Sequence, residues 1–414
     1  MATCFPSTNT STANGIPTGE ASPPPAIEAT LLTAGRDRHY ASGLAMALVS
    51  KGINLDVIGS DEVDGPELHT THKVNFLNLR ASQRQNTSFA KKIWSLLSYY
   101  ARLIQYAKSA KPRIFHILWN GKIEYFDRTV LMLYYKLLGK KIVFTAHNVN
   151  AGKRDLNDSW LNRLTLTIQY RLVDHIFVHT EKMKSELLED FGVREQNVTV
   201  IPYGINNSVP YSDLTAEAAK QRLGIADVEK AILFLGKIRP YKGLEYLLTA
   251  FQLLRSRGAN YRLIIAGEPT KASENYVDEI CRTINQEFGP GQIILKMQFI
   301  PDTEIELFLK AADVLVLPYK EIFQSGVLFL GYSFGLPVVA TDVGSLREEI
   351  IEGTTGFLCK PADPIDLAKT LETYFQSDLY KELPRRRLEI RDYGYSRHSW
   401  DIVGRLTHMV YTKL

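Results

Sequence analysis

Residues 231–243 read Ala-Ile-Leu-Phe-Leu-Gly-Lys-Ile-Arg-Pro-Tyr-Lys-Gly, and a helical pattern continues from Gly243 to Arg257. A short apolar run without alternating polar positions predicts a strand that is buried on both faces of a parallel sheet. A loop that is rich in cations and has a glycine at each end separates this strand from its helix. The stretch therefore predicts a strand–loop–helix unit of an α/β fold.

The same alternation of apolar runs and helical patterns recurs on both sides of this stretch. It predicts a first α/β unit that starts at Ile27 and a second that starts near Ala231, with a polar, proline-containing stretch at Pro202–Thr215 between them. The other predicted strands are Ile27–Leu32, Leu55–Ile58, Ile114–Leu118, Lys141–Thr145, His175–Val178, Tyr261–Ala266, Ile293–Met297, Val314–Leu317 and Pro337–Ala340. The other predicted helices are Tyr40–Lys51, Phe89–Lys108, Arg128–Leu138, Leu161–Leu172, Glu274–Phe288, Asp302–Ala311, Val327–Phe334 and Trp400–Lys413.

The composition of the 414-residue chain excludes several protein classes. A hydrophobic content of 45% and a charged content of 23% are typical of globular proteins, and a formal charge of +4 is too small for a dedicated nucleic-acid binder. No apolar run is long enough to predict a membrane-spanning helix. Three scattered cysteines predict neither a disulfide framework nor a zinc site, and they indicate a reducing, cytoplasmic compartment. Residues 1–25 lack the pattern of a secretory signal and are predicted to be a disordered tail.

The loop after the strand at residues 231–235 carries three cations. Lys237 and Lys242 lie five residues apart across a turn, and Arg239 lies between them. Their charges can converge on one anion beside the start of the following helix, which suits a pyrophosphate. The alternative is a solvated loop with ordinary surface lysines.

A second junction of this kind follows the strand that ends at Leu317, where a helix is predicted to begin near Ser325. The backbone N–H groups of Ser325, Gly326 and Val327 would be unpaired at the helix start, and Gly326 would let a phosphate approach the main chain closely. Ser325 is also a favourable N-cap, and the two interpretations are compatible.

Four motifs occur in one order along the second unit: Gly236–Gly243, Ala311–Pro318, Gly335–Thr341 and Gly353–Leu358. Together they resemble the retaining family 4 glycosyltransferases, also described as glycosyl transferases group 1. Residues 201–206 are similar to the segment that joins the two domains in that family. The resemblance implies the GT-B fold, in which two Rossmann-like, doubly wound parallel-sheet α/β domains face each other across a cleft.

The resemblance also implies the domain limits and the activity. An acceptor-side N-terminal domain is expected at residues 26–205, a nucleotide-sugar-binding C-terminal domain at 206–394, and a helix at 395–414 that packs back on the N-terminal domain. The expected reaction transfers a sugar from a UDP- or GDP-linked donor to a glycan, glycolipid or lipid-linked acceptor, with retention at the anomeric carbon. It would belong to polysaccharide or glycolipid biosynthesis and would need neither a metal nor another cofactor.

In the family, an arginine and a lysine five residues later bind the donor diphosphate. Lys237 takes the arginine position and Lys242 the lysine position, so the charge is retained while the bidentate guanidinium is lost. The other residues that the resemblance places at the donor are Arg239, Glu321, Gln324, Ser325, Gly326 and Val327.

The two glutamates that the family tends to carry around this helix start are absent. Counting back from Gly335, their positions hold Ile322 and Leu330, and the nearest carboxylate is Glu321, one residue early. Gln324 and the two residues after it resemble a Gln-Ser-Gly signature of one branch of the family. The departure leaves two alternatives open: a catalytically impaired nucleotide-sugar-binding or partner subunit, and a sugar-nucleotide epimerase of the same fold.

On the acceptor side, Gly35 matches a glycine loop that passes beneath the donor phosphates in relatives, and His147 matches a histidine that lines their sugar pocket. We expect His147 to act with Lys237 and Lys242 in catalysis. A neutral imidazole can hydrogen-bond a sugar hydroxyl, and a histidine satisfied by core contacts is the alternative. Further acceptor-side candidates are Arg36, Arg38, Trp119, Asn120 and Asn148.

The segment from Leu68 to Lys122 contains ten Lys and Arg residues and no Asp or Glu. Aromatic and aliphatic residues are interleaved with these cations, so residues 80–113 are predicted to contact a membrane surface. The expected location is therefore the cytoplasm, with a peripheral contact at the inner face of the plasma membrane. The alternative is a helix that covers the sheet and exposes a solvated basic face.

Overall fold

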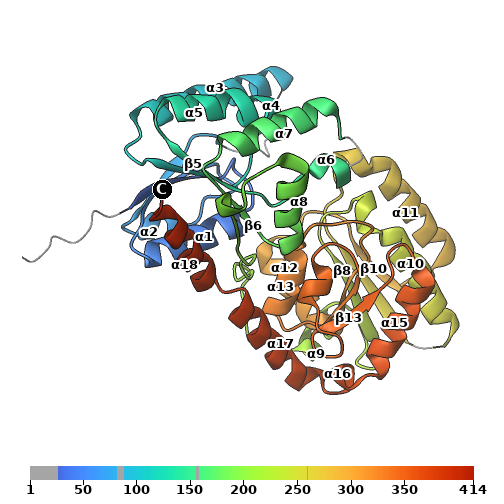
Figure 1. The fold of residues 1–414 in the computed structure, drawn as a ribbon. Helices are drawn as coiled ribbons and strands as arrows, with labels where there is room; N and C mark the ends of the chain where they lie inside the picture. Colours follow the sequence, from blue (N-terminus) through green and yellow to red (C-terminus); the bar gives the residue numbers. More distant parts are fainter. Residues whose placement is uncertain (1–26, 82–87, 155–157, 259) are drawn as a thin grey trace, which may run out of the picture.

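The computed structural model describes residues 27–81, 88–154, 158–258 and 260–414, and these residues form two α/β domains (Figure 1). The predicted disordered tail at residues 1–25 lies outside the described part of the chain. Each domain is built on a parallel sheet whose faces are covered by helices. The predicted fold class, two doubly wound parallel-sheet domains, is confirmed.

The N-terminal domain contains a seven-stranded sheet. Its strands are β1 (Glu28–Leu32), β2 (Asn54–Gly59), β3 (Val74–Asn78), β4 (Ile114–Ile117), β5 (Lys141–Thr145), β6 (His175–Val178) and β7 (Val198–Val200). Their order across the sheet is β3-β2-β1-β4-β5-β6-β7, so the carboxyl ends of β1, β4, β5 and β6 lie in one row. Its helices are α1 (Arg38–Ser50), α2 (Pro66–Thr70), α3 (Phe89–Ser109), α4 (Glu124–Phe126), α5 (Met132–Leu137), α6 (Ala151–Arg154), α7 (Trp160–Leu172) and α8 (Glu181–Phe191).

The C-terminal domain contains a six-stranded sheet. Its strands are β8 (Lys230–Leu235), β9 (Tyr261–Ala266), β10 (Ile293–Lys296), β11 (Val314–Leu317), β12 (Val338–Thr341) and β13 (Gly356–Cys359). They are ordered β10-β9-β8-β11-β12-β13, which makes β8 and β11 neighbours at the point where the chain reverses its direction across the sheet. The helices that follow β7 are α9 (Ala216–Arg222), α10 (Leu244–Ser256), α11 (Glu274–Glu287), α12 (Asp302–Ala311), α13 (Gly326–Ser333), α14 (Leu346–Glu349), α15 (Pro364–Gln376), α16 (Asp378–Lys381), α17 (Leu383–Arg397) and α18 (Trp400–Tyr411).

Strands β3, β7 and β13 are missing from the predicted set. All three lie at the edges of the two sheets, and each exposes part of its side chains. Asn75 and Thr199 interrupt the apolar runs of β3 and β7, and β13 begins at a glycine that leaves an apolar run of only three residues. The predicted helix Arg128–Leu138 is also divided, because Asp127–Leu131 forms a π-helical turn before α5.

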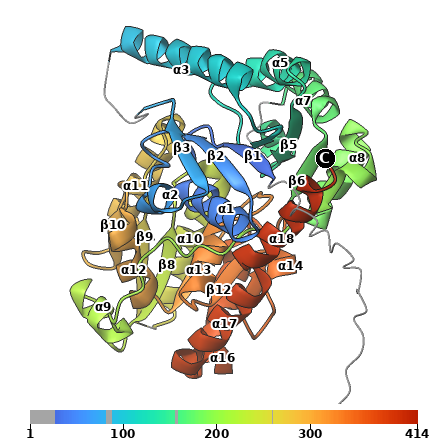
Figure 2. The same ribbon diagram turned by 90° about the vertical axis from the view of Figure 1, so that its left-hand side faces the viewer.

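Helix α18 follows the C-terminal domain in sequence but packs beside α1 of the N-terminal domain (Figures 1 and 2). Its first residue, Trp400, presses on Gly43 and Gly204, where a Cβ atom would lie only 2.2 and 2.3 Å from the indole ring. At its other end, the hydroxyl of Tyr411 lies 2.7 Å from Nδ1 of His116 in β4. Helix α18 therefore completes the core of the N-terminal domain.

The predicted membrane-contacting segment forms α3, which exposes apolar side chains. Trp94 is 73% exposed and Leu97 is 55% exposed. Residues 82–87 of this segment lie outside the described part of the chain. Among the described residues, no helix is both long enough and apolar enough to cross a bilayer.

Candidate functional site

The loop after β8 brings Lys242 against the start of α13. Gly236 has a φ of +113°, and a Cβ atom on it would lie 2.9 Å from Nζ of Lys242 and 3.2 Å from Cγ2 of Val327. Lys242 is only 6% exposed, and its Nζ lies 5.3 Å from the centre of the Tyr319 ring. Two predicted donor-site residues, Lys242 and Val327, therefore meet around a glycine whose missing side chain leaves room beside the ammonium group.

The other two cations of this loop are less enclosed. Lys237 is exposed, and Arg239 is half-buried just before the 3-10 turn Pro240–Lys242. Water screens the charge of an exposed ammonium far more than that of a buried one. Of the three predicted cations, Lys242 is therefore the one that the fold holds in a desolvated position.

The start of α13 carries two predicted residues with buried polar groups. The hydroxyl of Ser325 lies 3.2 Å from the hydroxyl of Tyr319, and it makes no hydrogen bond to the first turn of the helix. Ser325 therefore occupies the predicted N-cap position of α13, but its side chain makes no capping hydrogen bond. Both amide atoms of Gln324 are buried without a hydrogen-bond partner in the described part of the chain. An unpaired buried polar group costs about 1–3 kcal/mol, so this amide can gain hydrogen bonds from a polar ligand.

The linker residue Tyr203 connects this helix start to the N-terminal domain. Its ring stacks on Phe329 of α13 with a centre distance of 5.4 Å and an angle of 14°. Its hydroxyl donates to Asp37 over 3.2 Å and lies 3.3 Å from the place of a Cβ atom on Gly326. Burial and the charge of Asp37 raise the pKa of Tyr203 well above its ordinary value, so it stays a neutral donor. Tyr203 is absent from the predicted site residues.

The predicted glycine loop follows β1 and has an unusual backbone. Ala34, Gly35 and Asp37 have φ angles of +50°, +63° and +45°. The N–H of Gly35 donates to the hydroxyl of Thr33 over 3.1 Å, and the buried guanidinium of Arg80 donates to the carbonyl of Ala34. A left-handed conformation costs a non-glycine residue about 1–2 kcal/mol. Strain of this kind is frequent at functional sites.

Arg36 and Arg38, in the same loop, have different surroundings. Both are exposed, and Nη2 of Arg38 lies 3.3 Å from a carboxylate oxygen of Glu67. Arg36 lies among other cations: burial lowers the pKa of Lys122, and the charges of Arg80 and Arg36 lower it further. Arg36 therefore adds to a positive region beside the glycine loop, whereas the charge of Arg38 is matched by Glu67.

His147 follows β5 and is enclosed by aromatic rings. Trp119 stacks on it at 4.5 Å and 6°, and Tyr40 meets it edge-on at 4.6 Å. Its Nδ1 lies 3.0 Å from Nε2 of His179, whereas its own Nε2 is buried and has no partner among the described residues. Burial lowers the pKa of His147 well below its ordinary value, so the ring is neutral. Core contacts alone therefore do not satisfy this histidine.

The remaining acceptor-side candidates lie near His147. One face of Trp119 is covered by the imidazole, so that face cannot carry a sugar. Nδ2 of Asn120 donates to Oε1 of Gln169 over 3.1 Å, while its Oδ1 is buried without a partner in the described ranges. Asn148 is half-buried. The predicted site residues do not include His179. It directly follows the predicted strand His175–Val178, and His147 similarly lies two residues after the neighbouring strand Lys141–Thr145.

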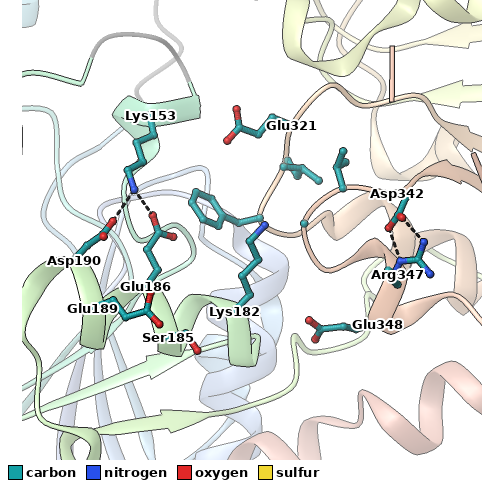
Figure 3. A pocket seen from close by; sticks show the side chains of 14 residues that line it. Lys153, Lys182, Ser185, Glu186, Glu189, Asp190, Glu321, Asp342, Arg347 and Glu348 are labelled. Carbon is teal, nitrogen blue, oxygen red and sulfur yellow. Dashed lines mark hydrogen bonds and ion pairs between the residues drawn. The ribbon is translucent and has the colours of Figure 1, made fainter. Parts of the chain in front are cut away.

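A pocket of about 730 Å³ lies between α8 and the loops after β11 and β12 (Figure 3). On the wall that the N-terminal domain contributes, Nζ of Lys153 lies 3.1 Å from Glu186 and 2.6 Å from Asp190. Glu321 is exposed and lines this pocket opposite Lys153, whereas Lys242 does not line it. Glu321 therefore lines this pocket, and the N–H of its neighbour Lys320 donates to the carbonyl of Tyr241 in the cation-bearing loop over 2.8 Å.

The two positions at which the family resemblance leads us to expect glutamates are part of the hydrophobic core. Ile322 is 8% exposed and Leu330 is 6% exposed, and both pack in the core of the C-terminal domain. Among the described residues, there is also no cluster of three or more His, Cys, Asp or Glu side chains that could hold a metal ion.

Comparisons with known proteins cover both domains. Residues 39–209 match the model of "Glycosyltransferase Family 4", and residues 215–396 match that of "Glycosyl transferases group 1". The chain is 26% identical over 365 residues to D-inositol 3-phosphate glycosyltransferase of Corynebacterium diphtheriae. The matched region covers 83% of this chain and 82% of that protein.

Solved structures with the same fold are more distant in sequence. Sucrose-phosphate synthase from Thermosynechococcus elongatus has a TM-score of 0.73 at 17% identity, covering 94% of this chain and 98% of that one. HepE from Anabaena, in a complex with UDP-glucose, has a TM-score of 0.71 at 16% identity, covering 94% and 99%. The arrangement of both domains is therefore that of known GT-B proteins.

Proposed function

Because the chain belongs to the GT-B glycosyltransferases of family 4 and group 1, we propose that it transfers a hexose from a UDP- or GDP-linked donor with retention of the anomeric configuration. The acceptor in this proposal is a glycan, a glycolipid or a lipid-linked sugar, and the product belongs to a polysaccharide or glycolipid. The observation that carries the proposal is the buried ammonium of Lys242 beside the start of α13.

In this proposal the leaving diphosphate lies between Lys242 and the first N–H groups of α13. Negative charge grows on the diphosphate as the glycosidic bond breaks, and fixed positive groups stabilise that charge. Lys242 suits this role because its charge is little screened by water. Lys237 and Arg239 would contribute at the rim. We assign no protein side chain as general base, since the family resemblance implies that the donor phosphate takes the proton of the acceptor.

A donor screen tests the proposal. The purified chain is incubated with UDP-, GDP- and ADP-sugars, with and without sugar and lipid acceptors, and nucleotide release is followed. We expect release from one class of donor and its loss in Lys242→Ala. Lys369→Ala, which removes an exposed lysine of α15, is the matched control and should behave as the wild type. Undiminished release by Lys242→Ala would contradict the assignment.

A second function, nucleotide-sugar binding without transfer, is favoured by the apolar core positions Ile322 and Leu330. It predicts nucleotide binding by calorimetry and no release of nucleotide with any acceptor. In that case Leu330→Glu is the first variant to examine for a gain of turnover. Circular dichroism must accompany it, because a carboxylate at a buried position destabilises the fold unless a ligand pairs with it.

We also propose that α3 and the helices beside it contact an anionic bilayer. Helices α3, α5 and α7 lie at the same end of the molecule (Figure 1), and the hydroxyl of Tyr134 in α5 donates to a carbonyl of α3. Leu137 of α5 is 78% exposed and Trp160 of α7 is 75% exposed, as Trp94 is on α3. The exposed cations of α3 are Lys91, Lys92, Arg102 and Lys108.

Vesicle flotation tests this contact. We expect the wild type to float with phosphatidylglycerol vesicles and not with phosphatidylcholine vesicles, because both the apolar surface and the cations contribute to binding. The double variant Trp94→Ser/Leu97→Ser should remain in solution. Leu388→Ser, which removes an exposed leucine of α17, serves as the control. No flotation of the wild type, or equal flotation with neutral vesicles, would disprove the proposal.

A further inference from the structure

We infer that His179 fixes the tautomer of His147, so that His147 presents an unprotonated ring nitrogen to a hydroxyl group of the transferred sugar. The inference rests on the proposed function, because it takes the transferred sugar as the ligand. It adds a positioning residue and a rule of sugar selectivity to that function. A short chain of hydrogen bonds from Ile201 through His179 to His147 fixes the positions of the protons.

The chain starts at the backbone. Nδ1 of His179 lies 3.2 Å from the carbonyl oxygen of Ile201, at the end of β7. A carbonyl oxygen only accepts hydrogen bonds, so Nδ1 of His179 carries a proton. Burial lowers the pKa of His179 to about 4, so the ring carries one proton at neutral pH and its Nε2 is an acceptor.

The second step transmits this choice to His147. Nε2 of His179 lies 3.0 Å from Nδ1 of His147. One of these two nitrogens must donate, and since that of His179 is unprotonated, the proton lies on Nδ1 of His147. His147 is also neutral, so its Nε2 carries a lone pair and no proton.

The third step concerns what Nε2 of His147 can bind. This atom is buried and has no partner among the described residues, and Trp119 and Tyr40 hold the ring from two sides. A hydroxyl group can donate to the lone pair. A carboxylate can only accept, so it would leave the nitrogen unpaired and would repel it. We therefore expect a hydroxyl group of the sugar beside Nε2 of His147, and not the carboxylate group of a uronate.

Other unpaired groups are consistent with a polyhydroxylated ligand. The Oδ1 of Asn120 and both amide atoms of Gln324 are buried without partners in the described ranges. Asn120 belongs to the loop after β4, and Gln324 to the loop before α13. Hydroxyl groups can both donate and accept, so each of these groups can hydrogen-bond to a hydroxyl group.

Nitrogen NMR reads the tautomer directly and needs no turnover. Protein with ¹⁵N-labelled histidine is examined by long-range proton–nitrogen correlation, and His147 is assigned from the signals lost in His147→Gln. We expect a protonated Nδ1 and an unprotonated Nε2 on His147. In His179→Phe, which keeps an aromatic ring and removes the acceptor, the proton should move partly or fully to Nε2. His179→Gln retains an amide oxygen that can accept and should preserve the wild-type tautomer.

Two results would overturn the inference: a protonated Nε2 on His147 in the wild type, or an unchanged tautomer in a folded His179→Phe. If circular dichroism shows that His179→Phe does not fold, the wild-type spectrum still decides. A kinetic arm uses the donor found in the screen and its uronate counterpart. We expect the wild type to prefer the neutral sugar, and His179→Phe to lose about tenfold in that preference through kcat/KM.

The two arms separate the possible failures. Absence of transfer activity would count against the proposed function and would leave the tautomer result standing. Transfer with the wrong tautomer would reject the role of His179 and retain the glycosyltransferase. A His179→Phe variant that slows both donors equally would rule out the selectivity rule, because a purely structural role predicts that outcome.

Discussion

The two domains have the same architecture, yet they contribute different chemistry to the site. In the C-terminal domain, the buried ammonium of Lys242 and the start of α13 come from two adjacent strand–loop–helix junctions. In the N-terminal domain, His147 and His179 are neutral and enclosed by rings from several elements. In the proposed function, charge stabilisation and sugar recognition are therefore divided between the domains.

Acid should destabilise the N-terminal domain more than the C-terminal domain, and this is the largest difference that we expect between them. Burial lowers the pKa of His116 to about 3 and that of His179 to about 4, and it lowers the pKa of His147 well below its ordinary value. The unfolded chain therefore binds more protons below a pH of about 6.5, and each such histidine removes about 1.4 kcal/mol of unfolding free energy per pH unit. Stability is complete above that pH and is lost progressively as the pH falls toward 4.

One carboxyl group opposes this trend. Burial raises the pKa of Asp127 to about 6, so between pH 6 and 4 the folded state binds the extra proton there. The histidines outnumber it, and we expect net loss of stability. Urea unfolding at pH 7, 6 and 5, combined with hydrogen exchange of each domain, measures the effect. Earlier loss of protection in the C-terminal domain would break the comparison.

Lys242→Ala should have the next largest effect. It removes the desolvated cation from the phosphate side, and we expect kcat to fall by about 10²- to 10³-fold. The fall should be similar for every donor sugar that the wild type uses, because this residue faces the leaving group. Steady-state kinetics with two donors measures the fall in kcat. If the fall depended strongly on the sugar, Lys242 would contact the sugar and not the leaving diphosphate.

Tyr411→Phe should weaken the N-terminal domain alone. It removes the hydroxyl that lies 2.7 Å from Nδ1 of the fully buried His116 and leaves that nitrogen unpaired. We expect a loss of about 1–3 kcal/mol in the free energy of urea unfolding. Tyr395→Phe, at a residue of α17 that is 40% exposed, is the control. Equal effects of the two variants would show that α18 does not complete this core.

The smallest effect is expected for Lys237→Ala. Its ammonium is exposed, so it should contribute less than about 1 kcal/mol, or about fivefold in kcat/KM. Raising the salt concentration should reduce the difference from the wild type, because mobile ions screen exposed charges. A loss as large as that of Lys242→Ala, unaffected by salt, would mean that donor binding closes the loop over Lys237.

Local pattern was sufficient where an element is contiguous and buried. The run at Tyr261–Ala266 and the strand Lys141–Thr145 coincide with β9 and β5, since both faces of these strands are covered. The edge strand β3 reads Val-Asn-Phe-Leu-Asn and is half-exposed, so its polarity hides it. The phosphate-side candidates could be identified for the same reason: Lys242 and Ser325 each lie in a single strand–loop–helix junction.

The residues proposed to lie near the sugar could not all be predicted from local sequence pattern. His179 matters because β6 lies beside β5, and Tyr203 matters because the linker turns back across α13. Neither the pairing of these strands nor the contact of the linker with α13 can be inferred from the residues adjacent in sequence. Leu330 is a different case: the sequence shows that its position lacks an acid, but only the packing shows that its side chain belongs to the hydrophobic core.

The position of α18 has a consequence for biosynthesis. The N-terminal domain is translated first, but His116 and the groove beside Gly43 receive their partners from a helix that follows the whole C-terminal sheet. Domains usually fold as units while the ribosome is still elongating the chain. Here the core of the N-terminal domain stays incomplete until the C-terminal domain and α18 have been translated. Nascent chains stalled before Trp400 should therefore expose this groove to chaperones and proteases.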